Sequence, residues 1–133
     1  MKKLLTFGIF FIMFSPIPSI AQKTSKMEDK SYSIEIIRYN IPEQERSHFE
    51  KSYEAAGEYL QASEFCLGYQ VIHGNEEPNH YIVIIHWTSQ QEHLQGFRKS
   101  KVFIPFFDLV KPFYAHIEEM KHYEPTSNKW KRE

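Results

Sequence analysis

Residues 81–107 read YIVIIHWTSQQEHLQGFRKSKVFIPFF. The first five, Tyr81 to Ile85, are apolar at every position and rich in β-branched side chains, which predicts a strand covered on both faces. Ser89 and Glu92 then have the spacing of a capping box, in which the Ser oxygen and the Glu carboxylate each accept a free amide at a helix start. The stretch therefore predicts a buried strand that passes directly into a helix.

The segments on either side predict a single β-α-β-β-α-β domain. Four segments have the apolar patterns of strands: 33–41, 65–73, 81–87 and 117–123. Two helical stretches connect them, one from Pro42 to about Ser63 and one from Ser89 to Val110, and Pro105 predicts a break in the second near Ser100. This order predicts an α+β, ferredoxin-like fold, with a four-stranded antiparallel sheet and its helices on one face.

The other face of this sheet needs a cover of its own. Along the third predicted strand, Tyr81, Val83 and Ile85 point to one face, and Ile82 and Ile84 to the other. Helices cover only one of these faces, and monomers rarely expose a large apolar patch. We therefore expect a homodimer that packs sheet to sheet.

The N-terminus has the pattern of a secretory signal. A basic start precedes an apolar run over 4–14, and Ser19-Ile20-Ala21 provides small residues for cleavage before Gln22. The run is too short for a stable membrane span. The predicted organisation is a signal peptide (1–21), a flexible leader (22–32), a domain (33–125) and a disordered tail (126–133), in a periplasmic or secreted protein.

Composition excludes several classes of function. Removing residues 1–21 takes away two lysines and no acid, so the formal net charge falls from −1 to −3, which does not suit a nucleic-acid partner. Cys66 is the single cysteine, so an internal disulfide is excluded. The seven histidines have no clear ligand spacing, and we predict no metal site.

Several segments resemble the antibiotic biosynthesis monooxygenase (ABM) family. They are Ile37–Pro42, Cys66–Tyr69, His86–Ser89, His93–Ser100 with Phe103, and Ile117–Glu124. The resemblance covers about residues 33–125 and implies a dimeric α+β barrel. In active members it implies oxygenation of an electron-rich aromatic or quinol without metal or flavin, and in one branch it implies haem binding and degradation.

The resemblance also implies where polar residues of the family would stand. Haem-degrading members place an Asn, a Trp and a His at positions that correspond to Ile37, Phe97 and Phe107, and quinol-oxidising members place a His at Phe97. These three side chains are apolar here, and Phe cannot ligate iron. We therefore predict no haem and no other cofactor.

Cofactor-free oxygenation needs an apolar site with a base that favours the ionised substrate. A neutral His is a plausible base, and His93 and His86 are the two candidates. The candidates for substrate binding combine aromatic walls with a few polar groups: Tyr39, Tyr69, Trp87, Phe97, Arg98, Phe103 and Phe107. The alternative for each is structural, as core packing, solvated surface or, for His86, a dimer interface.

Two classes of function stay open. The first is an exported, cofactor-independent monooxygenase that acts on a small aromatic or quinol. The second is a non-catalytic, dimeric module that binds a small ligand. The side chains that face a cavity between the helices and the sheet distinguish the two, because a base in that cavity favours the enzyme.

Overall fold

The computed structural model describes residues 32–133. The strands form one antiparallel sheet in the order β2-β3-β1-β4, with bounds β1 (Ser33–Asn40), β2 (Cys66–His73), β3 (His80–Trp87) and β4 (Ile117–Tyr123). All four predicted strands are confirmed to within one residue at each end. The predicted signal peptide and residues 22–31 of the predicted leader lie outside the described residues.

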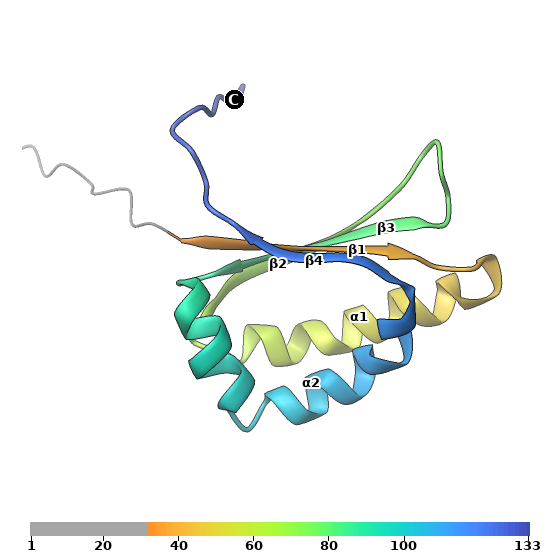
Figure 1. Ribbon diagram of the computed structural model, residues 1–133, viewed down its shortest axis with the longest axis horizontal. Helices are drawn as coiled ribbons and strands as arrows, with labels where there is room; N and C mark the ends of the chain where they lie inside the picture. Colours follow the sequence, from red (N-terminus) through yellow and green to blue (C-terminus); the bar gives the residue numbers. More distant parts are fainter. Residues whose placement is uncertain (1–31) are drawn as a thin grey trace, which may run out of the picture.

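Both α-helices cover the same face of the sheet (Figure 1). They are α1 (Arg46–Gln61), which follows a 3₁₀ turn over Glu43–Glu45, and α2 (Phe103–Val110). The predicted ferredoxin-like α+β fold is thereby confirmed. No helix in the range 32–133 has the length and apolar character to cross a membrane.

The second helical stretch is divided more finely than predicted. It consists of a π-helical turn (Glu92–Gly96), a 3₁₀ turn (Phe97–Lys99) that ends at extended Ser100, and then α2. Pro105 is the third residue of α2, where its missing amide costs no helical hydrogen bond. The predicted break near Ser100 is confirmed, but the helical path does not end at Val110 as predicted, because a 3₁₀ segment continues to His116.

The capping box is confirmed in its first half. The Glu92 amide donates to the Ser89 hydroxyl oxygen at 3.0 Å. The Glu92 carboxylate accepts from the Ser89 hydroxyl at 3.3 Å, whereas a full capping box would bring it to the Ser89 amide. One amide of the turn is therefore satisfied as expected.

Strand alternation divides β3 between two environments. Tyr81, Val83 and Ile85 are almost fully buried beneath the helices, whereas Ile82 and Ile84 are partly exposed on the opposite, open face. The open face has an apolar patch made by five isoleucines from three neighbouring strands: Ile34, Ile36, Ile72, Ile82 and Ile84.

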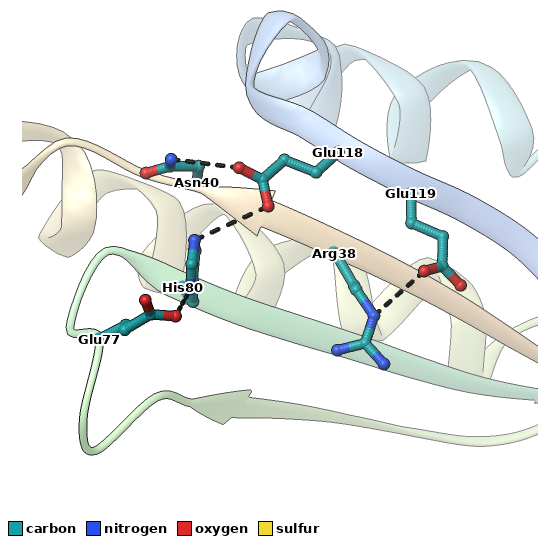
Figure 2. Close-up of polar contacts among 6 residues, drawn as sticks. All are labelled: Arg38, Asn40, Glu77, His80, Glu118 and Glu119. Carbon is teal, nitrogen blue, oxygen red and sulfur yellow. Dashed lines mark hydrogen bonds and ion pairs between the residues drawn. The ribbon is translucent and has the colours of Figure 1, made fainter.

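A β-bulge in β4 adds a polar corner to this open face. Arg38 pairs with Glu119 and Tyr39 pairs with Ile117, so Glu118 is an extra residue and its carboxylate joins that of Glu119 on the open face. Figure 2 shows the result: Glu119 accepts from Arg38 at 3.2 Å, and Glu118 accepts from Asn40 at 3.2 Å. His80 lies 3.7 Å from Glu118 and 2.6 Å from Glu77, so the carboxylates of this corner have polar partners close by.

Candidate functional site

A cluster of polar side chains lies beneath the π-helical turn, on the helix-covered face of the sheet. Glu35 comes from β1, Trp87 from β3, His122 from β4 and His93 from the π-helical turn. Glu35 and His93 are only 1% and 3% exposed. Buried ionisable groups are costly unless they are paired, so such a cluster is a candidate site.

Glu35 has one bonded and one unbonded carboxylate oxygen. Its Oε2 accepts a hydrogen bond from Trp87 Nε1 at 2.9 Å. Its Oε1 is buried and has no hydrogen-bond partner within residues 32–133. His93 Nε2 lies 3.7 Å from Oε2, which is beyond hydrogen-bond range. The carboxylate is thus oriented by Trp87 and keeps a free acceptor.

His93 is held on three sides. Its ring stacks on Trp87, with centroids 4.1 Å apart and planes 5° from parallel. Arg98 Nε donates to His93 Nε2 at 3.3 Å, and His93 Nδ1 lies 2.7 Å from His122 Nε2. Because Nε2 accepts from Arg98, the proton of the neutral His93 ring is on Nδ1 and is donated to His122.

The π-helical turn places His93 in this position. The Phe97 amide donates to the carbonyl oxygens of both Glu92 and His93, five and four residues back. The turn is therefore wider than an α-helical one, and both His93 and Phe97 are buried. Such π-helical turns often occur at functional sites.

Burial shifts the proton affinities of the cluster in opposite directions. Burial raises the pKa of Glu35, against the opposing effects of the Trp87 hydrogen bond and of Arg98. Burial, Arg98 and His122 together lower the pKa of His93 to about 3. Burial and Arg98 also lower the pKa of His122. At neutral pH His93 is therefore uncharged, and Glu35 binds a proton more readily than an ordinary carboxylate.

A small cavity of about 10 Å³ adjoins the cluster. Glu35, His93 and Arg98 line it, together with an aromatic and aliphatic wall: Ile37, Tyr53, Ile85, Trp87, Phe97, Phe103, Phe106, Val110, Tyr114 and Met120. Its volume suits about one water molecule. A larger groove of about 690 Å³ lies at the surface beside α1 and β2, but charged side chains line much of it and it does not reach the cluster.

The structure brings together five of the residues singled out from the sequence. They line the cavity beside Glu35: His93, Trp87, Phe97, Arg98 and Phe103. Phe107 lies one layer further out and stacks on Phe103, with centroids 5.5 Å apart.

Three other candidates lie apart from the cavity. Tyr39 is buried and shares a 2.6 Å hydrogen bond with the hydroxyl of Tyr53, which does line the cavity. Tyr69, on β2, donates to the Tyr53 carbonyl oxygen at 3.3 Å. His86 is on the open face and stacks on Tyr32, so the two predicted bases are on opposite faces of the sheet.

Glu35 and His122 belong to the cluster and were not among the predicted site residues. Alternation along 33–41 puts Glu35 on the same face as Ile37, Tyr39 and Ile41, and a carboxylate on a buried apolar face is a signal that could have identified it. His122 carries no comparable signal, because its partner His93 is 29 residues away.

The same cluster contains the donor types of a metal site, although its geometry does not suit one ion. Glu35, His93 and His122 each offer a ligand atom, and these atoms lie within 4.8 Å of one another. Zinc bonds of 2.0–2.1 Å place neighbouring ligand atoms roughly 3.3 Å apart. The closest pair here is 2.7 Å apart, and the Arg98 cation lies 3.3 Å from His93. The cluster is therefore better described as a hydrogen-bonded acid-base group.

Comparison with known proteins assigns the family. The profile of the antibiotic biosynthesis monooxygenases matches residues 33–108, more than half of the chain, and the protein belongs to this family. No curated protein matches the chain in sequence.

Solved structures share the fold at low sequence identity. A protein of Bordetella bronchiseptica assigned to the same family is 21% identical, with a TM-score of 0.64 over 72% of this chain and 98% of its own. A point mutant of SnoaB of Streptomyces nogalater, a cofactor-independent oxygenase, is 14% identical, with a TM-score of 0.57 over 77% and 98%. A Caulobacter crescentus protein is 16% identical, with a TM-score of 0.61 over 74% and 92%. At these identities the likeness shows the fold.

Proposed function

We propose that the protein is an exported, cofactor-independent monooxygenase that acts on a small aromatic or quinol substrate. The observation that carries the proposal is the unbonded Oε1 of buried Glu35, beside a cavity walled by aromatic rings. Membership of the family and the fold shared with SnoaB, a cofactor-independent oxygenase, support the same class of reaction.

In the proposed reaction, this chain's residues favour the substrate anion. Glu35 Oε1 takes a proton from the substrate, and the raised pKa of Glu35 brings it nearer to the working pH of a general base. Arg98 stabilises the negative charge on the substrate. The anion then passes an electron to O₂. For a methylene carbon, one oxygen atom enters as a carbonyl, and the other leaves as water with the two hydrogens that the carbon loses.

The small volume of the cavity favours a second candidate function. A volume of about 10 Å³ cannot hold an aromatic ring, so the substrate must displace side chains of the wall. Phe103, Tyr114 and Met120 are the partly exposed residues of the wall and lie nearest to solvent. If they do not move, the alternative is a non-catalytic module of the same fold that binds a small ligand elsewhere.

Oxygen uptake separates these alternatives. We would supply metal-free and flavin-free protein with a panel of quinols and hydroxylated aromatics. Glu35→Gln keeps the acceptor for Trp87 but removes the base, so uptake should fall about a hundredfold. His48→Gln changes an exposed histidine on α1 and serves as the matched control.

The two bases predicted from the sequence are compared in the same assay. His93→Ala should lower uptake strongly, because His93 contacts the cluster. Loss of uptake in His86→Ala alone would place the reaction on the open face and contradict the proposal. If the wild-type protein consumes no oxygen with any substrate, the binding module is the better description.

The proposal includes assembly and location. A second copy of the chain would cover the apolar patch of the open face, and the mature protein would act in the periplasm or outside the cell. The five patch isoleucines and the signal pattern of residues 1–21 support these two parts.

A further inference from the structure

The Glu35 cluster extends from the internal cavity to the molecular surface. Glu35 lines the cavity, His93 lies 3.7 Å from its Oε2, and His122 lies 2.7 Å from His93. His122 in turn lines a surface depression of about 370 Å³ together with Tyr32, Ser33, Ser89 and Gln90. Two imidazoles thus connect a buried carboxylate with solvent.

The tautomers of the two rings are suited to proton transfer. Arg98 donates to His93 Nε2, which leaves the His93 proton on Nδ1, pointing at His122 Nε2. His93 therefore has a donor toward His122, and its Nε2, 3.7 Å from Glu35 Oε2, can accept a proton from that side once Arg98 releases it. A ring in this state can accept a proton on one nitrogen while it releases one from the other, so no buried imidazolium needs to persist.

We infer that Glu35, His93 and His122 form a proton path between the cavity and the surface depression. The inference rests on the proposed oxygenation, for which it assigns His122 as a positioning and proton-transfer residue that does not touch substrate. It also explains why two histidines accompany a carboxylate that Trp87 alone could orient.

Each step of the path moves one proton. The substrate proton bonds to Glu35 Oε1, and the carboxyl group makes a half-turn toward His93. Arg98, whose side chain is exposed, releases Nε2. His93 Nε2 then gains a proton as Nδ1 passes its own to His122 Nε2, and His122 gives its Nδ1 proton to water. In the second half of the reaction the path runs in reverse and supplies one proton for the water that leaves. Over one reaction, no net proton therefore passes between the cavity and solvent.

The test is chemical rescue. His122→Ala should lower kcat about tenfold or more in dilute buffer, because it removes the ring at the surface end of the proton path. KM should stay within about twofold, because His122 does not touch the substrate. Added imidazole, which fits the space left by the ring, should restore kcat. His122→Gln covers the case in which the Ala variant fails to fold, and His48→Ala is the control. A loss of kcat that imidazole does not restore, or no loss at all, would overturn the inference.

A second readout does not depend on activity. Nitrogen NMR of the wild-type protein should show His93 neutral, with its proton on Nδ1 and coupled across the hydrogen bond to His122. A proton on Nε2 would overturn the path even if the enzyme is active. Stoichiometric Zn²⁺ binding that shifts both rings would identify a metal site instead. If no substrate is oxidised, the NMR result still decides the arrangement, so the two proposals fail separately.

Discussion

His93 makes an acid-dependent contribution to stability. Its pKa is lowered to about 3 in the folded protein, whereas an unfolded His titrates near 6.5, so the unfolded chain binds the extra proton between these values. This contribution is complete above about pH 6.5 and is lost as the pH falls toward 3. The groups that face His93 are Glu35, Arg98 and His122.

We therefore expect His93→Gln to flatten the acid limb of the stability curve. As the pH falls from about 6.5 to about 4, the unfolding free energy of the wild-type protein should fall faster than that of the variant. The difference should be up to about 1.4 kcal/mol per pH unit. The raised pKa of Glu35 acts with the opposite sign in both proteins, so the difference between them isolates His93. Urea unfolding at a series of pH values measures it, and parallel curves would refute the prediction.

At the scale of single residues, the sequence predicted the aromatic wall better than the polar cluster. Trp87, Phe97 and Phe103 follow from apolar spacing within one stretch, and His93 is in the same stretch. Glu35 meets Trp87 across 52 residues of chain, and its bond depends on the pairing of β1 with β3. Local patterns carry no information on such contacts, so the carboxylate and its second histidine partner could be found only in three dimensions.

At the scale of elements, Gly96 controls how the π-helical turn packs. A Cβ at this position would lie 2.6–2.8 Å from three ring atoms of Phe65, which is closer than real contacts allow. We expect Gly96→Ala to destabilise the protein by about 1–3 kcal/mol, because overpacking outweighs the better helix propensity of Ala.

Gly68 provides the matched control for this change. A Cβ at Gly68, on β2, meets nothing within 4 Å, so Gly68→Ala should stay within about 0.5 kcal/mol of the wild-type protein. Urea midpoints of the two variants compare them directly. Trimming the ring in Gly96→Ala/Phe65→Leu should recover part of the loss, and equal midpoints for the two Ala variants would contradict the packing argument.

Element boundaries were predictable where a local apolar pattern or a single proline determines the backbone conformation. Apolar patterns located all four strands, and Pro105 located the break at Ser100. The type of helical turn was not predictable, because the hydrogen bonds from the Phe97 amide to Glu92 and His93 depend on how the turn packs on the sheet.

At the scale of the whole molecule, the open face predicts assembly. Ile84→Asp places a carboxylate in the centre of the apolar patch, where a buried unpaired charge is costly, so it should convert a dimer into monomers or unfold the domain. Ile104→Asp changes an isoleucine on α2 that is 62% exposed and should leave the mass unchanged. Sedimentation at micromolar concentration is the measurement, and a stable wild-type monomer would disprove the dimer.

The location of the protein is tested through its N-terminus. The pattern over residues 1–21 predicts that exported material begins at Gln22. Intact-mass spectrometry of the periplasmic and secreted fractions reads the first residue directly. A chain that still carries Met1 in those fractions, or one found only in the cytoplasm, would refute the cleavage.

The π-helical turn makes the chemistry of this protein depend on chain length. An α-helix advances about 100° per residue, and a π turn accommodates one residue more than an α turn between the same two ends. Deleting Gln95 would let Glu92–Gly96 relax into an ordinary helix and would turn His93 away from Trp87 and His122, with every side chain of the cluster still present. A relative could therefore lose the cluster through a single-codon deletion, so substitutions at the cluster positions alone would not reveal which relatives keep it.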